Sequence, residues 1–267
     1  MSLHYHCPIC KQPLALNDKT LRCDNNHSFD FAKEGYVNLL PVQNKNSKQP
    51  GDSLEMVQAR RSFLEQGYYG FLQTALANIV KPLNADIVID LGCGEGFYTH
   101  AIANNSQANV YGVDISKSAV KYAAKRYKQC HFSVASISQA PFDDHLADVL
   151  VSVFAPLFDS ELARLVKDSG HLIVASPGPT HLKELKDYIY SNVNEHTEIA
   201  APAGFENTSQ QLITEQVSLT FNDVKNLIMM TPFAWKFRPE HWQALEQKQQ
   251  HSVTLSFYVT QFTKTAL

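Results

Sequence analysis

The sequence has no excess of basic residues: its 267 residues include 23 Lys and Arg against 26 Asp and Glu, for a net charge of −3. This balance argues against a protein coated in basic surface, and by itself it favours a small-molecule substrate over nucleic acid. No apolar run is long enough to cross a membrane, and the first residues, MSLHYHCPIC, lack the pattern of a signal peptide. We therefore expect a cytoplasmic protein that does not enter a membrane.

Cysteine is also scarce, and the five present, an odd number, indicate metal or thiol chemistry rather than a disulfide scaffold. Cys7 and Cys10 form a C-x-x-C pair, and Cys23 and His27 follow with three residues between them. Each pair can lie on a tight turn, so that four ligands meet one tetrahedral ion, and thiolates with imidazole suit Zn²⁺. A redox-active pair is the alternative, but the βαβ context of such motifs is lacking.

Residues 1–42 are too few to build a core of their own, so a bound metal would supply the missing stabilisation. We assign them to a zinc-binding module, in which His4 and His6 compete with His27 for the fourth ligand position. Residues 43–53 contain no apolar residue and are expected to form a mobile linker. Residues 43–70 are then linker and helix, and 71–267 a second domain.

The most informative stretch is 87–98, IVIDLGCGEGFY, which begins with three β-branched residues typical of a buried strand. The glycines that follow, Gly92, Gly94 and Gly96, are spaced G-x-G-x-G rather than G-x-G-x-x-G. Asp90 lies two positions before the first of them, where it would repel a pyrophosphate and attract an amino group or a sulfonium. The pattern resembles the first motif of Rossmann-like S-adenosylmethionine-dependent methyltransferases, and a bare strand-to-helix turn is the structural alternative.

Further polar residues follow the next strands at the same expected edge of a sheet. Asp114, about two dozen positions after Asp90, ends a second strand, where a carboxylate accepts hydrogen bonds from both ribose hydroxyls. Ser136 follows the third strand, where many such enzymes have an acidic residue facing the adenine amine. The sequence 154–157, FAPL, ends the fourth strand and lacks the (Asp/Asn)-Pro-Pro-(Tyr/Phe) turn of exocyclic-amine methylation. Cys93 and Cys130 are interpreted as structural, so carbon-5 methylation of pyrimidines is also disfavoured.

From residue 87 onward, apolar strand patterns alternate with helical ones, which predicts a parallel sheet flanked by helices. The expected fold class is α/β, a Rossmann-like class I methyltransferase sheet with a small N-terminal zinc-binding module. Strands are predicted near 87–91, 110–114, 131–134, 148–153, 170–175, 212–221 and 253–262, the last two antiparallel. Helices are predicted near 71–81, 97–104, 116–127, 159–167 and 180–192, with another from about residue 52.

Four features have two interpretations each. Arg60 and Arg61 belong to a solvated helix face or contact phosphate. Tyr69 is a core aromatic or folds over the cofactor. His181, after the rigid Pro-Gly-Pro turn, is a surface residue or lies near the methionine end of the cofactor. The stretch 227–238, LIMMTPFAWKFR, is a base-stacking platform or core with a snorkelling lysine.

Taken together, the Cys/His module, AKEGYVNLLP, PGDSLEMVQARRSFL, DLGCGEG, PGPTHL and MTPFAW closely resemble one family. It is the family of large-subunit (23S) ribosomal RNA guanine-N1 methyltransferases that modify a guanine in hairpin 35 of domain II. The resemblance covers nearly the whole chain, and the zinc module followed by AKEGYVNLLP is its most specific part. It implies S-adenosylmethionine and Zn²⁺ as cofactors, large-subunit rRNA as the substrate, and a homodimer.

The resemblance also implies roles for individual residues. Zinc would be held by Cys7, Cys10, Cys23 and His27. The cofactor would contact Tyr69, Gly94, Glu95, Asp114 and His181, besides the loop residues Asp90 and Gly92 and the adenine-side Ser136. Because the net charge is negative, RNA contacts would come from local clusters such as Lys33, Arg60 and Arg61.

The chemistry requires an unpaired guanine, since its N1 carries a proton and is buried in Watson–Crick pairing. No side chain is identified as a general base from the sequence. A small-molecule methyltransferase would explain the acidic charge but leaves the zinc module without a role. A non-catalytic zinc-dependent RNA-binding protein would not require the Asp90–Asp114 cofactor site.

Overall fold

The computed structural model describes residues 3–41 and 51–265, so most of the linker expected at 43–53 lies outside the described residues. Its main element is a mixed sheet with the strand order β10-β11-β9-β8-β5-β6-β7-β4. The strands are β4 (Tyr36–Asn38), β5 (Ile87–Leu91), β6 (Asn109–Asp114), β7 (His131–Val134), β8 (Ala147–Val153), β9 (Val166–Pro177), β10 (Phe205–Leu219) and β11 (His251–Lys264). All neighbours pair in parallel except β11 with β9 and β10 with β11.

This topology confirms the expected Rossmann-like α/β fold. The chain runs outward from β5 through β6 to β7 and then returns to place β8 on the other side of β5. The direction of strand order therefore reverses next to β5, and ligands of such sheets bind at the carboxyl ends of the strands at that point. The strands β5 and β7 have the predicted bounds; β5 begins with three buried β-branched residues, and β7 is a short run with three buried residues, Phe132, Ser133 and Val134.

The helices are α1 (Leu54–Leu64), α2 (Gly70–Val80), α3 (Phe97–Asn105), α4 (Lys117–Arg126), α5 (Asp159–Leu165), α6 (Lys183–Lys186), α7 (Phe221–Met229) and α8 (Pro239–Glu246). Alternate side chains of the strands enter two separate cores. Val88, Val149 and Val151 pack with α2 and α7 residues in one core. Ile89, Leu150 and Val174 enter the other, which includes α5 and the N-terminal segment. No helix among the described residues is long and apolar enough to cross a membrane.

The N-terminal segment is attached to the large sheet in two ways. It forms its own small antiparallel sheet of β1 (Ala15–Asn17), β2 (Thr20–Arg22) and β3 (Ser28–Asp30), and β4 then pairs with β7 at the edge of the large sheet. Tyr5 is buried, with its ring 5.6 Å from that of Tyr111 and 5.3 Å from that of Phe142. Residues 36–38 therefore belong to the large sheet although they precede residue 42.

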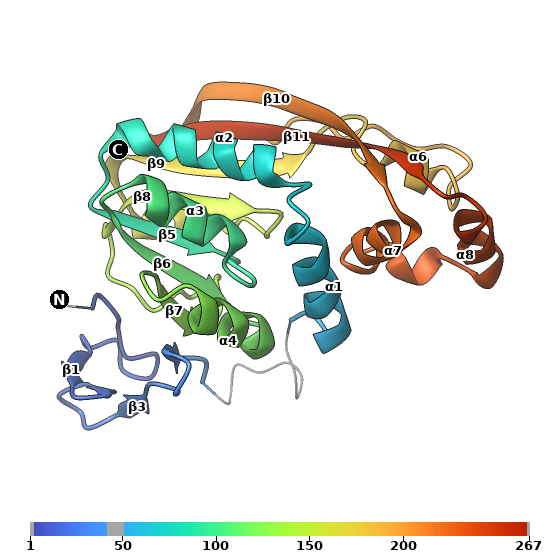
Figure 1. Cartoon of the computed structure of the whole chain (residues 1–267). Helices are drawn as coiled ribbons and strands as arrows, with labels where there is room; N and C mark the ends of the chain where they lie inside the picture. The colour runs from blue at the N-terminus through green and yellow to red at the C-terminus, as the bar shows by residue number, and fades with distance from the viewer. Residues whose placement is uncertain (1–2, 42–50, 266–267) are drawn as a thin grey trace.

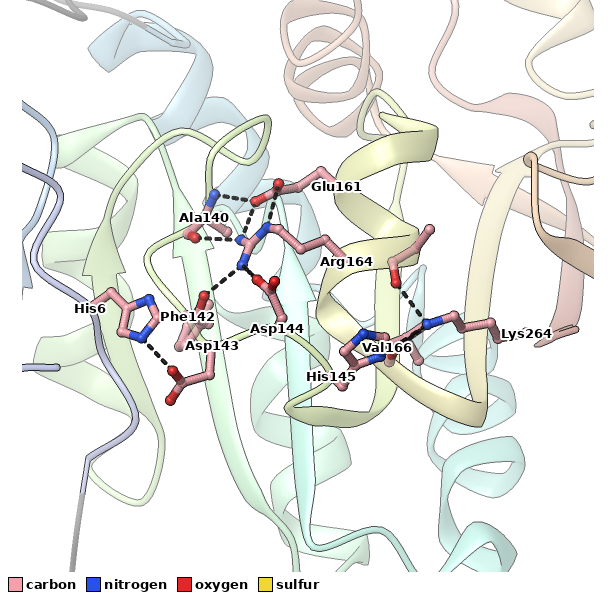
Figure 2. A network of polar contacts seen from close by, with 11 residues as sticks. His6, Ala140, Phe142, Asp143, Asp144, His145, Glu161, Arg164, Val166 and Lys264 are labelled. Atoms are coloured by element: carbon pink, nitrogen blue, oxygen red, sulfur yellow. Dashed lines mark hydrogen bonds and ion pairs between the residues drawn. The ribbon is translucent and has the colours of Figure 1, made fainter. Parts of the chain in front are cut away.

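A polar network fixes the loop before β8, against which the N-terminal segment packs (Figure 2). Arg164 of α5 donates to the carbonyls of Ala140 and Phe142, and to the carboxylates of Glu161 and Asp144. His6 pairs with Asp143 of the same loop, and its backbone N–H donates to the Pro141 carbonyl at 2.8 Å. His6 is thus occupied away from the cysteines, which leaves His27 as the histidine of the metal cluster.

The last strands form a long hairpin that extends past the sheet. β10 pairs with β11 along its full length, whereas β9 pairs only with residues 257–263 of β11. The free half of the hairpin leads into α7 and α8, and α7 lies beside α1 (Figure 1). Within the 227–238 stretch, Leu227 and Ile228 are core residues, whereas Trp235 is 80% exposed. The core interpretation therefore holds for the first part of the stretch and fails for Trp235.

The predicted helix at 180–192 is wrong in extent, since α6 includes only Lys183–Lys186. The missing C-terminal part, residues 187–192, DYIYSN, consists of Asp, Tyr, Ile, Ser and Asn, which are weaker helix formers than Ala or Leu. The chain instead folds back on α6, where the amine of Lys186 contacts Nε2 of His196 at 2.7 Å.

Candidate functional site

The metal cluster consists of Cys7, Cys10, Cys23 and His27, whose ligand atoms all lie within 4.8 Å of one another. Nδ1 of His27 is 3.5 Å from the sulfur of Cys7 and 3.5 Å from that of Cys23. The sulfurs of Cys10 and Cys23 are 3.6 Å apart. A tetrahedral zinc ion with ordinary bond lengths requires S···N edges of about 3.5 Å and S···S edges of about 3.8 Å. The spacing therefore fits one Zn²⁺. The sulfurs of Cys10 and Cys23 are too far apart for a disulfide, whose S–S bond is about 2.05 Å long.

The glycine loop after β5 is packed tightly against the end of β8. Gly92 has φ +83°, and a Cβ there would lie 2.6 Å from the Cβ of Ala155. Gly96, with φ +80°, precedes α3, and its added Cβ would lie 2.9 Å from the ring of Phe132. Glycine is required at both positions for conformation and for space. As a result, the loop contacts the FAPL turn directly.

Three carboxylates surround this loop. Asp114 accepts hydrogen bonds from the backbone N–H of Gly94 at 2.9 Å and of Ser116 at 2.7 Å. Asp90 is buried and accepts from the hydroxyl of Thr99 at 2.6 Å. Among the described residues, the second oxygen of Asp90 and Oε2 of Glu95 are buried without a hydrogen-bond partner. Unpartnered buried carboxylate oxygens are costly, so their presence indicates a ligand that supplies donors or positive charge.

Arg60 lies at this loop and not on a solvated helix face. It pairs with Asp52 at 2.5 Å, and its guanidinium lies 3.9 Å from the position of a Cβ on Gly94. Burial by itself lowers the pKa of Arg60, but Glu95, Asp52 and Asp114 outweigh this effect and the net pKa is raised. Neither sequence interpretation identified this position, because the contact joins α1 to a loop more than thirty residues away.

An aromatic cluster lies beside the loop, at the ends of β8 and β9. His181 is buried, with its ring 4.7 Å from Phe257, 6.4 Å from Phe154 and 6.5 Å from Tyr69. Its Nδ1 accepts the backbone N–H of Ser256 at 3.3 Å, which places the ring proton on Nε2. Burial, with Lys186 and His196 nearby, lowers the pKa of His181 to about 3. His181 is therefore neutral at physiological pH.

Phe154 is the unusual member of this cluster. It has φ +55°, which is strained for a phenylalanine, and 45% of it is exposed. One side of the ring packs on Phe257, with centroids 5.5 Å apart. The neighbouring Ala155 contacts Gly92, so an exposed aromatic ring is held at the junction of the glycine loop and the open end of β8.

Comparison with known proteins agrees with these two sites. Residues 5–48 match the model of the RlmA N-terminal zinc ribbon, and residues 83–252 match a methyltransferase domain. The chain is 32% identical to the 23S rRNA (guanine(748)-N(1))-methyltransferase of Streptomyces fradiae, over 96% of this chain and 95% of that protein. The chain belongs to the RlmA family of 23S rRNA guanine-N1 methyltransferases.

Two further similarities, one in sequence and one in structure, are as follows. The RlmA-type chain is 29% identical to YxjB of Bacillus subtilis, provisionally named a 23S rRNA (guanine-N(1)-)-methyltransferase, over 94% of each protein. Among solved structures, the YcgJ protein of Bacillus subtilis overlaps with a TM-score of 0.48 at 18% identity, over 73% of this chain and 99% of that one.

The remaining expected cofactor residues of the RlmA fold lie around the same strand ends. Tyr69 is buried at the start of α2, and its ring is 5.0 Å from Phe257. Ser136 follows β7 and shares a hydrogen bond with the hydroxyl of Ser138 at 2.9 Å. The residues present fit S-adenosylmethionine, since the two unpartnered carboxylate oxygens can meet its cationic groups and Asp114 can meet the ribose.

We expect cofactor affinity to increase with pH. Burial raises the pKa of Asp90 to about 7, and burial, opposed by Arg60, raises the pKa of Glu95 to about 7. A cationic ligand favours the ionised carboxylates, so binding releases protons below pH 7 and not above it. For one such group, affinity for S-adenosylmethionine should rise about tenfold from pH 6 to pH 8.

Titration calorimetry in buffers of different ionisation enthalpy measures both affinity and proton release. The Asp90→Asn variant is the control, because it keeps the hydrogen-bonding shape and removes one titrating group. Its affinity should depend less on pH than that of the unchanged protein. Equal affinity of the unchanged protein at pH 6 and pH 8 would contradict this expectation.

Proposed function

We propose that this protein transfers the methyl group of S-adenosylmethionine to N1 of a guanine in hairpin 35 of 23S rRNA. The observation that carries the proposal is the presence of a Cys₃His cluster and an Asp90–Asp114 loop in one chain that aligns over 96% of its length with a guanine-748 enzyme. The zinc ribbon is thereby given a role in RNA recognition, which a small-molecule methyltransferase would not require.

In this proposal each site residue has a specific position on the cofactor. Asp114 accepts the ribose hydroxyls through the lone pairs that Gly94 and Ser116 leave free. Ser136 faces the adenine. Asp90 and Glu95 face the positively charged groups of S-adenosylmethionine, its sulfonium and its amino group. Tyr69 and His181 contact its methionine end.

When bound, S-adenosylmethionine would supply an electrophilic methyl group: its S–C bond would break as the N–C bond forms at N1, with S-adenosylhomocysteine as the product. The N1 proton must pass to an acceptor. His181 is a poor one, because its Nδ1 is already accepting from Ser256 and its Nε2 carries the proton. Backbone carbonyls of the 154–156 turn can orient the base by accepting a hydrogen bond from N1–H, but they are too weakly basic to keep the proton, which passes to solvent water. We assign no side chain as a general base.

The target guanine must leave its base pair, and we propose that it stacks on the exposed ring of Phe154. Stacking on an aromatic ring contributes about 1–3 kcal/mol per base. Replacing Phe154 with Ala should therefore lower kcat/KM for rRNA by roughly 10- to 100-fold. Affinity for S-adenosylmethionine should stay unchanged, since the loop contact is made by Ala155 and not by the ring.

Phe154→Trp should retain most of the activity, whereas Phe154→Leu, which is apolar but cannot stack, should resemble Phe154→Ala. Phe158→Ala is a matched control, because Phe158 is a nearby phenylalanine with similar exposure, 40%. Equal activity of the Leu and Trp variants would contradict a stacking role.

The function itself is tested with radiolabelled S-adenosylmethionine and 23S rRNA from cells that lack the modification. Nuclease mapping and mass spectrometry should find 1-methylguanosine in hairpin 35. Label at another nucleotide would show that the rRNA is the substrate but that the target guanine is not in hairpin 35. Cofactor binding without any transfer to RNA would overturn the proposal in favour of a small-molecule substrate.

The family resemblance also suggests a homodimer acting in the cytoplasm, where ribosomal subunits assemble. Sedimentation equilibrium of the zinc-loaded protein should give about twice the mass of one chain. If the protein is an active monomer at micromolar concentration, the proposed dimer is contradicted, whereas the proposed methyltransferase activity still stands.

A further inference from the structure

Helix α4 carries a row of lysines that the cofactor site does not use. Its inner side is buried through Ala119, Val120, Ala123 and Ala124. On the other side, intervals of four, four and three residues place the exposed lysines on one face of the helix and its end. They are Lys117, Lys121, Lys125 and Lys128.

Two adjoining hollows lie along this helix. One, of about 800 Å³, is lined by Lys33 of the N-terminal segment, by Leu54 of α1 and by three lysines of the row, Lys121, Lys125 and Lys128. The other, of about 310 Å³, lies between α1 and α4 and reaches Glu95 of the cofactor loop. Both are lined by Tyr122 and Lys125, so they adjoin along α4, and we call the two together the α1–α4 groove. In Figure 1, α4 lies between the N-terminal segment and α1.

The groove is basic although the whole chain is acidic. Its basic side chains are Lys33, Arg61, Lys121, Lys125, Arg126 and Lys128, against the acidic Glu34, Glu65 and Glu95. Glu34 lies 3.6 Å from Lys121, and Glu65 pairs with Arg126 at 2.5 Å. Within the described ranges, neither Lys33 nor Lys125 forms an ion pair. Concentrating cations on one face of a protein of net charge −3 favours a polyanionic partner.

The groove also offers a flat aromatic contact. The guanidinium of Arg61 lies 4.9 Å from the ring centroid of half-buried Tyr122, at the place where the two hollows join. Cations interleaved with aromatic rings are typical of surfaces that follow a single strand of nucleic acid. Of the three basic residues expected to contact RNA, Lys33 and Arg61 line the groove, whereas Arg60 turns away to the carboxylates of the cofactor site.

We propose that the α1–α4 groove binds the phosphate backbone of the rRNA strand between the zinc ribbon and the cofactor loop. This inference rests on the proposed function, since it takes rRNA as the substrate. The phosphates would compete with Glu34 and Glu65 for Lys121 and Arg126, the basic partners whose side chains are more than half exposed, and each lysine engaged would release a counterion. The groove would thus hold RNA recognised by the zinc ribbon in position for the guanine to reach Phe154.

The test compares RNA binding by the full-length, zinc-loaded protein and its Lys121→Gln/Lys125→Gln variant. At about 0.1 M salt the variant should bind a hairpin 35 transcript roughly tenfold more weakly. The slope of log affinity against log salt should fall by about 1.5, because each phosphate contact contributes about 0.7–0.9. Cofactor affinity and kcat at saturating RNA should not change.

Two control variants test whether the effect comes from the loss of charge in the groove, rather than from a change of side-chain shape there or from the loss of a lysine elsewhere. Lys121→Arg/Lys125→Arg keeps both charges in the groove and should retain RNA affinity and salt slope. Lys81→Gln removes an exposed lysine at the opposite end of the strands and should also bind normally. If the Gln variant keeps the affinity and slope of the unchanged protein, the groove proposal is overturned while the function stands. If the unchanged protein transfers no methyl group to rRNA, the function fails whatever the groove variants do.

Discussion

Replacing Asp114 with Ala should weaken S-adenosylmethionine binding by about 100-fold or more. The carboxylate would accept both ribose hydroxyls, and a hydrogen bond to a charged group contributes about 1.5–3 kcal/mol. It also holds the cofactor loop, since it accepts from the N–H groups of Gly94 and Ser116. Titration calorimetry measures the affinity, and circular dichroism checks that the fold is retained.

Two variants make this result specific. Asp114→Asn keeps one acceptor oxygen and the shape of the side chain, so its affinity should lie between those of Asp114→Ala and the unchanged protein. Asp86→Ala removes an exposed aspartate at the opposite end of β5 and should leave the affinity unchanged. An Asp114→Ala variant that binds the cofactor normally would show that Asp114 only shapes the loop.

The central part of the fold could be predicted because its signals are local. The sequence of β5 begins with three apolar β-branched residues, and a glycine-rich stretch follows the strand. Both features can be recognised from neighbouring residues alone, and the glycines do adopt positive φ. The zinc ligands could be predicted for the same reason, since each pair of ligands lies on one turn. The end of α6 was missed because tertiary contacts of the 187–204 segment, such as Lys186 with His196, determine its path.

Parts of the site depended on contacts between distant segments, and the sequence could not specify these. Arg60 looked solvated because its helix places it away from the apolar face, yet the carboxylates of another loop surround it. Phe154 was recognised as the end of a strand, but its exposure and positive φ depend on Phe257 and Gly92. The lysine row on α4 can be found in sequence, but its continuity with Lys33 arises only when β4 pairs with β7.

This pairing also determines how the metal affects the rest of the protein. The zinc ribbon contributes Tyr5 to the same core as Tyr111 and Phe142, and its chain continues into an edge strand of the large sheet. Loss of zinc should therefore destabilise the methyltransferase core as well as the ribbon. If the module were joined to the methyltransferase domain only by a linker, it would unfold without destabilising that domain.

We accordingly expect Cys23→Ala to lose zinc and to bind rRNA at least about 100-fold more weakly, since structural zinc commonly supplies about 10 kcal/mol or more of folding free energy. The melting temperature of the whole chain should fall by about 20 °C or more, because a loss of about 10 kcal/mol at about 2–4 °C per kcal/mol corresponds to about 20–40 °C at this size. Zinc content by atomic absorption, scanning calorimetry and RNA binding together measure the effect.

Cys130→Ala, which replaces a buried cysteine outside the cluster, should keep its zinc and its affinity for RNA. If Cys23→Ala lost zinc and RNA binding but kept the melting temperature of the unchanged protein, the ribbon would be an independent unit, and its packing through Tyr5 would contribute little to the core.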